Sequence, residues 1–193
     1  MNTSNTRGTA AQLCAYTGEI FLQMAGIAKP YLGPRKPLYR EHIGAHLRHI
    51  IEHYGALATA LATSGSPPSL PYMVDYDARA RNMQIETDPV FALDHMALLK
   101  RAFEALSETV MAQPVEVHVR GGLQGEHNFI TTSSVARELM FLNSHATHHF
   151  AIVQGYAHQR GETLGEGFGK APATVAHEQS QQFNAAPVAG VAA

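Results

Sequence analysis

Residues 138–155, with the sequence ELMFLNSHATHHFAIVQG, decide how the rest of the chain is interpreted. Their apolar side chains recur with the 3.6-residue period of a helix, and His145 and His149 lie four positions apart on one face. Side chains at that spacing are neighbours, about 5–6 Å apart at Cβ, so two imidazoles can bind one metal ion there. The stretch predicts a core-facing helix that carries half of a metal site. The competing interpretation is a pair of histidines with ordinary hydrogen bonds.

A second histidine-rich segment supplies the missing half. Four histidines fall at steps of four, three and four and therefore project from one side of a second helix: His42, His46, His49 and His53. A catalytic zinc site typically has three protein ligands and one open position, and one histidine from this helix completes that number. His49 is the first candidate because it is central and precedes two isoleucines. His46 and His53 are the alternatives, and a solvated or hydrogen-bonded histidine is the competing interpretation for each.

The composition indicates one domain with a sizeable core. The chain has 193 residues, of which 45% are hydrophobic and 16% are charged, below the roughly 25% charged residues of typical soluble proteins. A formal net charge of −2, without a basic run, argues against nucleic-acid binding. One cysteine, Cys14, excludes an internal disulfide. The absence of a secretory signal and of a run long enough to span a bilayer predicts a cytoplasmic protein without a membrane segment.

Apolar periodicity and helix-breaking residues predict four long helices, at about residues 9–28, 38–63, 88–113 and 133–159. Residues 115–119 alternate with period two and are followed by glycines, so they are expected to form a small β-hairpin with residues 126–132. The single domain is expected to span residues 1–177, and residues 178–193 are expected to form a disordered tail.

Residues 72–82 read as an irregular loop that carries two aspartates and two arginines. Loops on a helical scaffold often carry binding groups, and the pair Arg79 and Arg81 can hold a substrate carboxylate or phosphate. The alternative is mutual neutralisation with Asp75 and Asp77 at the surface.

The chain resembles the DinB-like family, which includes proteins described as metal-dependent hydrolases and thiol S-transferases. The resemblance covers roughly residues 10–175 and is carried by IGAHLRHIIEHY (43–54), YDARARNMQIETD (76–88), SSVARELMFLNSHATHHFAIV (133–153) and FGKAPAT (168–174). It implies an all-α fold, a four-helix bundle of the up-up-down-down kind, and the small hairpin predicted from the alternation then lies between helices three and four. It also implies one divalent ion, zinc or nickel, held by His49, His145 and His149, and frequent homodimers.

The resemblance implies a metal-dependent enzyme that acts on a small molecule, either a hydrolase or a transferase of a low-molecular-weight thiol. Either reaction needs a proton acceptor, for which Glu52 and Glu138 are the candidates. Asn143, Thr147 or a backbone carbonyl can accept the histidine N–H groups. The alternative is a non-catalytic metal-binding or structural bundle with a stress-related role, closed by His46 or His53 as a fourth ligand. A metal-free helical module is the third hypothesis.

Overall fold

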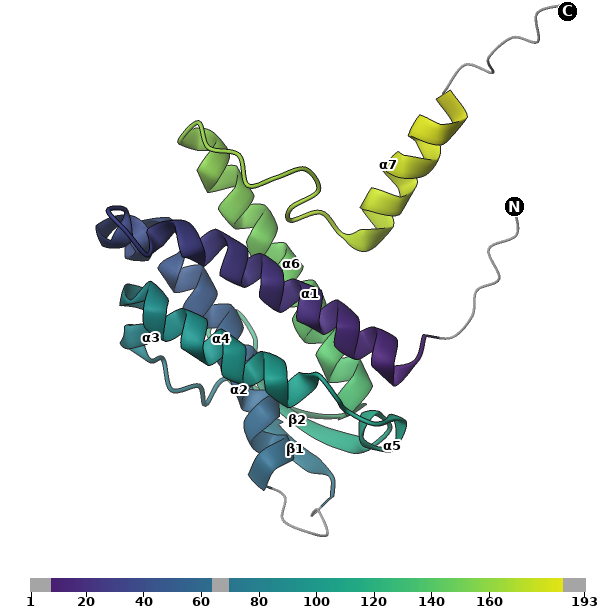
Figure 1. The fold of residues 1–193 in the computed structure, drawn as a ribbon. Coiled ribbons are helices and arrows are strands. Elements are labelled where there is room, and N and C mark those ends of the chain that lie inside the picture. The colour runs from purple at the N-terminus through teal and green to yellow at the C-terminus, as the bar shows by residue number, and fades with distance from the viewer. Residues whose placement is uncertain (1–7, 64–69, 186–193) are drawn as a thin grey trace, which may run out of the picture.

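The computed structural model describes residues 8–63 and 70–185 of the chain (Figure 1). Its body is built from four long helices: α1 (Ala10–Ala28), α2 (Ala45–Thr63), α4 (Pro89–Phe103) and α6 (Val135–Gln159). Helices α1 and α2 each pack against both α4 and α6, so the four enclose one hydrophobic core. This arrangement places α2 beside α6, the two helices that carry most of the histidines.

The helix ends follow from local side-chain chemistry. Thr9 forms a capping box with Gln12 at the start of α1. The Asp88 side chain accepts a hydrogen bond from the amide of Val90, and Pro89 occupies the first position of α4. The Ser134 hydroxyl accepts from the amide of Arg137 and starts α6. These caps fix where each apolar face begins, and hence which residues enter the core.

A three-stranded mixed sheet lies at one end of the helical body (Figure 1). Its strands are β1 (Tyr72–Asp75), β2 (Pro114–Gly121) and β3 (His127–Ser134), in the order β1-β2-β3. Strands β2 and β3 form the expected hairpin, and β1 pairs with β2 in parallel. The prediction of an all-α four-helix bundle is therefore wrong, because the fold combines helices with a sheet.

Residues 72–75 were expected to be irregular, but they form β1. The sequence does not reveal this strand, because only four residues alternate and the partner strand is distant in sequence. In the structure Tyr72 and Val74 are buried, while Met73 and Asp75 are exposed. The parallel register places Tyr72 opposite Val115, and β1 packs against α2. Burial of this face provides the stabilisation that local propensity does not supply.

Two helical segments also differ from expectation. The helix expected over 88–113 ends at Phe103, and a short helix, α5 (Glu108–Met111), begins separately because the Ser107 hydroxyl accepts from the Val110 amide. Helix α7 (Pro172–Ala185) includes residues 178–185, which were assigned to the disordered tail. Its alanines and glutamines and the single glutamate, Glu178, favour a helix, and Pro172 suits its first turn. Residues 186–193 lie outside the described residues.

The chain before α2 and the chain after α6 are fixed by close backbone contacts. A π-helical turn (Arg40–Gly44) leads into α2, and α3 (Met83–Thr87) approaches it so closely that a Cβ at Gly44 would lie 2.1 Å from the carbonyl oxygen of Glu86. Gly169 has φ +74° and touches the backbone of Ala151 on α6. Only glycine suits these two positions, where the chain passes close to the backbone of α3 and of α6. None of the described helices has the length and apolar character needed to cross a membrane.

Candidate metal centre

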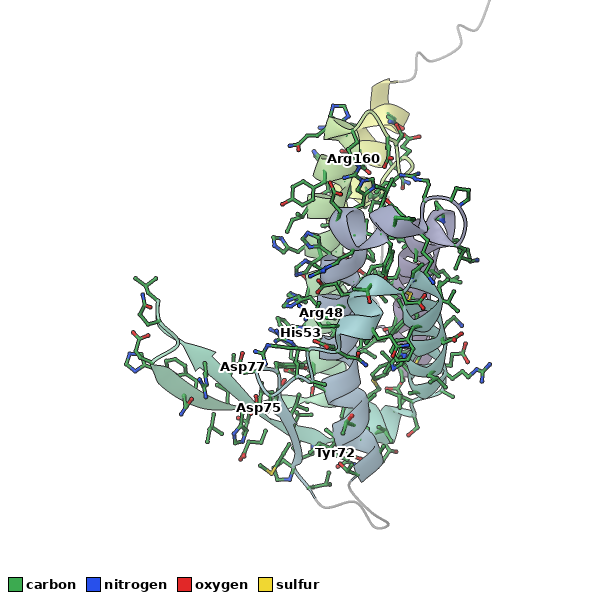
Figure 2. All side chains as sticks on the ribbon, turned by 90° about the vertical axis from the view of Figure 1, so that its left-hand side faces the viewer. Arg48, His53, Tyr72, Asp75, Asp77 and Arg160 are labelled. Atoms are coloured by element: carbon green, nitrogen blue, oxygen red, sulfur yellow. The ribbon has the colours of Figure 1, made fainter. Side chains whose placement is uncertain are left out.

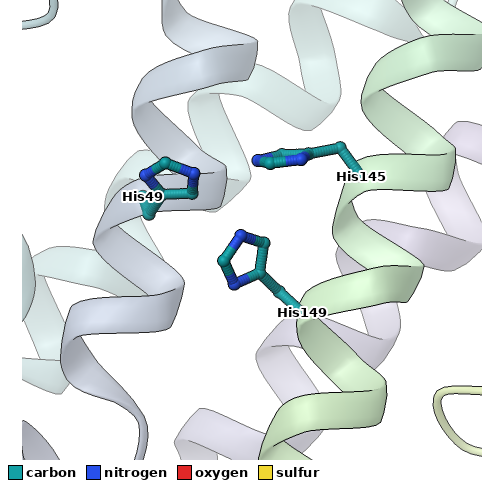
Figure 3. A group of neighbouring side chains, drawn as sticks. All are labelled: His49, His145 and His149. Carbon is teal, nitrogen blue, oxygen red and sulfur yellow. The ribbon is translucent and has the colours of Figure 1, made fainter. Parts of the chain in front are cut away.

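Three histidines from α2 and α6 converge in the seam between the two helices. One nitrogen each of His49, His145 and His149 lies within 4.8 Å of the other two. The ring centroids are 5.0 Å apart for His49 and His145, and 4.7 Å apart for each of the other two pairs. Figure 3 shows the three rings bordering a common space between the helices. The expected convergence of these rings is confirmed.

The distances between the three histidine nitrogens are close to those of a metal site. Zinc binds imidazole nitrogen at about 2.0–2.1 Å, so three tetrahedral ligand nitrogens lie about 3.4 Å apart. The nitrogens lie within 4.8 Å of one another in the structure. Ring rotations that move each nitrogen by about 1 Å would bring them to the tetrahedral spacing. All three side chains are half-buried, whereas Ile50, Leu142 and Ala146 of the same two helices are fully buried in the core.

The three imidazoles are neutral near pH 7 because they are removed from water and crowd one another. Burial is the main cause that lowers the pKa of His49 to about 3, and the neighbouring His53, His149 and His145 contribute to the shift. Burial likewise lowers the pKa of His145 to about 4 and that of His149 to about 4. Neutral imidazole is the form that binds metal ions.

His145 provides the most direct indication of a ligand. Its Nε2 atom is buried and has no hydrogen-bond partner among the described residues. Buried polar atoms are rarely left unpaired, because the loss of water is not compensated. A metal ion would satisfy this nitrogen together with those of His49 and His149, so the residues present fit a divalent cation that prefers imidazole.

His46 supports the centre from behind and was not anticipated in this role. Its Nδ1 lies 2.9 Å from Nδ1 of His149, which leaves Nε2 of His149 free to face the seam. If His149 held a metal through Nε2, its Nδ1–H would donate to Nδ1 of His46, and this hydrogen bond would fix the ring orientation. Asn143 and Thr147 were predicted to accept the histidine N–H groups, but both form hydrogen bonds within the core instead. The step of three from His46 to His49 was the available clue.

His53 is committed to other partners. Its Nδ1–H donates to the carbonyl oxygen of His49 at 2.7 Å, and its Nε2 lies 3.4 Å from a guanidinium nitrogen of Arg79. Both ring nitrogens are therefore engaged, so His53 cannot add a fourth ligand without losing a hydrogen bond. The histidines further away also have partners: His42 pairs with Tyr31, and His118 on the sheet pairs with Glu116.

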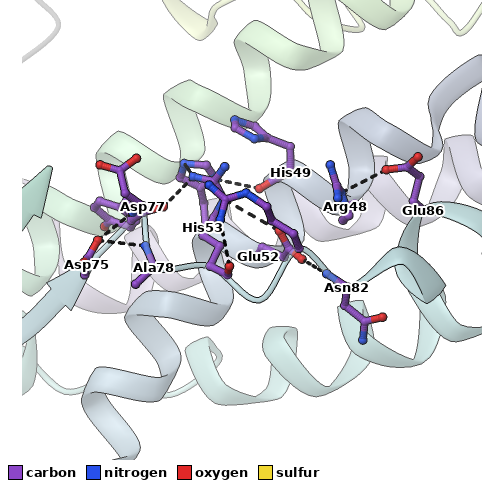
Figure 4. A network of polar contacts seen from close by, with 12 residues as sticks. Arg48, His49, Glu52, His53, Asp75, Asp77, Ala78, Asn82 and Glu86 are labelled. Atoms are coloured by element: carbon purple, nitrogen blue, oxygen red, sulfur yellow. Dashed lines mark hydrogen bonds and ion pairs between the residues drawn. The ribbon is translucent and has the colours of Figure 1, made fainter. Parts of the chain in front are cut away.

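The two carboxylates nominated as proton acceptors are held by other groups. The buried Glu138 accepts a hydrogen bond from the Tyr76 hydroxyl at 2.7 Å. Glu52 accepts from the backbone amide of Asn82 and forms an ion pair with Arg79, at 3.8 Å between Oε2 and Nε (Figure 4). Among the described residues the group of converging ligands contains three histidines and no carboxylate.

Aromatic rings surround the seam. Phe141 stacks on His145 with 5.8 Å between centroids, and Tyr76 stacks on His53 at 5.5 Å. Tyr156 lies beside His46 at 5.8 Å. Phe141 and Tyr156 are exposed, so a small molecule that reaches the histidines from solvent can contact apolar surface at the same time.

A separate cavity of about 590 Å³ is lined in part by the loop after β1. Its wall includes Glu52, Arg79 and Asn82, and its apolar lining comes mainly from α2 and α4, with Met73 of β1 and Ile85 of α3. The three histidines do not line it. Figure 2 shows Asp75, at the end of β1, and Asp77, in the loop that follows, on the side of α2 that carries His53.

Comparison with known proteins assigns no family. No family model matches the chain, and no solved structure matches it. FK506-binding protein 5 of Rhizopus delemar is 28% identical over 109 residues, which make up 56% of this chain and 28% of that protein. The chain thus spans little more than a quarter of the length of this relative. At this identity and coverage, the activity of the relative cannot be transferred to the chain.

Proposed function

We propose that the protein is a divalent-metal-dependent enzyme that acts on a small molecule, either by hydrolysis or by transfer of a thiol. The carrying observation is the group formed by His49, His145 and His149, in which three neutral imidazoles meet without a fourth ligand among the described residues. Structural zinc sites are usually closed by four protein ligands, whereas catalytic sites keep one position open. Zinc or nickel is the proposed ion because imidazole suits both.

The two reaction types are those implied by the resemblance to the DinB-like family, and that membership is part of the proposal. When bound, a divalent ion lowers the pKa of a coordinated water toward about 7 or deprotonates a thiol. The protein's own contribution is to keep the imidazoles neutral by burial, to orient His149 through His46, and to surround the seam with aromatic rings. These groups arrange and desolvate the reacting molecule.

The engaged nitrogens of His53 favour this function over a purely structural metal site. A closed site would need His53 to release the His49 carbonyl or Arg79. Ligation through Nδ1 of His46 would release His149, because that atom forms the hydrogen bond between the two rings. Each change leaves a half-buried polar atom unpaired, which costs about 1–3 kcal/mol.

Elemental analysis of protein purified without a histidine tag tests the ligand set. One equivalent of metal is expected in the wild type and less than a tenth of that in His49→Ala, His145→Ala and His149→Ala. His118→Ala is the matched control, because His118 is equally half-buried but hydrogen-bonds to Glu116 on the sheet. Wild-type metal content in all three seam variants would refute the assignment.

A second measurement separates the enzyme from a structural site. The cobalt-loaded protein is titrated with a small thiol, and the visible spectrum is followed. An open position predicts a new sulfur-to-cobalt charge-transfer band. An unchanged spectrum at saturating thiol, with cobalt still bound, would mean that the ion has no coordination position open to a thiol. This result would contradict the enzymatic proposal. Hydrolase and thiol-transferase assays on the wild type, with His145→Ala as the inactive reference, then assign the reaction.

A further inference from the structure

The two arginines in the loop after β1 have different environments. Arg79 turns toward α2, its side chain is 14% exposed, and it donates hydrogen bonds to the Tyr76 carbonyl and to His53 Nε2. Arg81 is exposed, has φ 49°, and among the described residues donates to the carbonyl oxygen of Arg79. Only Arg79 therefore brings a positive charge to the histidine seam.

The guanidinium of Arg79 is not fully satisfied by its neighbours. Its Nε is buried without a hydrogen bond among the described residues. Glu52 is an ion-pair partner at 3.8 Å, which is too long for a hydrogen bond. The other oxygen of Glu52 already accepts from the amide of Asn82. A buried guanidinium with a spare donor favours binding of an additional anionic group.

The candidate ligand set on the other side of His53 has no negative charge. His49, His145 and His149 contribute neutral nitrogens only, and the carboxylate of Glu138 is held by Tyr76. A divalent ion held by these three residues would keep its full charge, because none of the ligands is an anion, and it would be the largest local charge. The His53 ring lies 4.3 Å from the His49 ring and 4.6 Å from the His145 ring, so it stands between this centre and Arg79.

We propose that the substrate of the centre is an organic anion, whose carboxylate or similar oxyanion group is bound beside His53 by Arg79 and the divalent ion together. This inference rests on the proposed function and names its substrate class. Arg79 acts as the binding residue that selects an anion over a neutral molecule of the same shape. Its planar fork suits a carboxylate, which a lysine ammonium matches less well.

Cobalt-loaded full-length protein provides the test. Sodium acetate and neutral acetamide are titrated at constant ionic strength, and the visible spectrum reports ligand exchange at the metal. Acetate is expected to shift the spectrum and acetamide to leave it unchanged. Arg79→Gln should raise the apparent Kd for acetate about tenfold, the loss of one charge-assisted hydrogen bond. Arg81→Gln is the matched control and should bind acetate as the wild type does.

The possible outcomes distinguish this inference from the proposed function. Equal acetate affinity in the wild type and Arg79→Gln overturns the role of Arg79 while leaving the metal centre intact. Equal response to acetate and acetamide overturns the substrate class. Failure of the wild type to bind cobalt overturns the proposed function and, with it, this inference. Circular dichroism verifies that the variants fold. If Arg79→Gln does not fold, Arg79→Lys replaces it, and its apparent Kd for acetate should lie between that of the wild type and a value about tenfold higher.

Discussion

Half-buried histidines occur both in the seam between α2 and α6 and on the sheet at the end of the molecule, but their hydrogen-bond partners differ. On the sheet, His118 has its own carboxylate partner, Glu116, at 2.8 Å. In the seam, His49, His145 and His149 have no carboxylate partner among the described residues and face one another instead. Burial alone therefore does not distinguish a candidate metal site. The seam differs from the sheet because its three imidazoles converge and could hold an ion together.

The largest expected effect is stabilisation of the folded protein by metal, which should require the histidines of the seam. Added zinc at a hundred times its Kd should stabilise the wild type by about 2.7 kcal/mol, because it binds only the folded chain. His145→Ala should lose this stabilisation. Thermal unfolding with and without zinc, at fixed protein concentration, measures it. Comparable stabilisation of His145→Ala would break the comparison between the two regions.

The support of His149 by His46 should come next in size. His46→Leu removes the acceptor of the His149 N–H and should weaken zinc binding by about 10–100-fold. His46→Gln retains an acceptor and should recover most of the affinity. Competition with a chromophoric chelator measures both variants. Equal loss in the two would show that His46 matters by packing and not by its hydrogen bond.

The pH dependence of the metal-free protein should also follow the seam. His49, His145 and His149 titrate in the folded state at pKa values of about 3, 4 and 4, whereas the unfolded pKa of histidine is about 6.5. Between these values the unfolded chain binds more protons, so the free energy of unfolding should fall as pH falls below about 6.5, down to about pH 4. Urea unfolding in chelator at several pH values measures the slope. His49→Gln should make the slope shallower, and an unchanged slope would contradict the lowered pKa of this residue.

The smallest effect is expected on the sheet. His118→Ala removes a partly exposed pair with Glu116, which should change the free energy of unfolding by at most about 1 kcal/mol. Metal content should remain that of the wild type. Urea unfolding and elemental analysis on one preparation measure both quantities. A loss of metal in this variant would place a ligand on the sheet and remove the distinction between the two regions.

Several features could be predicted from sequence because they depend on neighbours along the chain. The spacing of His145 and His149 places both on one face of α6 in any helix, and the alternation before Gly121 and Gly122 anticipates the β2–β3 hairpin. The choice of His49 among four histidines followed from its central place in an apolar stripe. The homodimer implied by the resemblance stays a prediction, which sedimentation analysis would check.

Other features depend on contacts between distant segments. Strand β1 exists because residues 72–75 find β2 and the side of α2, and this pairing replaced the expected all-α bundle by a mixed fold. Glu52 and Glu138 were predicted to be proton acceptors because the sequence does not show that Asn82 and Tyr76 donate hydrogen bonds to them. The inward turn of Arg79 and the outward turn of Arg81 depend in the same way on where the loop meets α2.

The sequence by itself determined which residue types are available and which of them share a helix face, because a helix repeats every 3.6 residues wherever it lies. Tertiary structure decided which faces meet: it brought His49 to His145 and His149, placed His46 behind His149, and put Arg79 beside His53. The physical reason is that packing and hydrogen bonding between elements are settled by the whole core, whose contacts a local pattern does not encode.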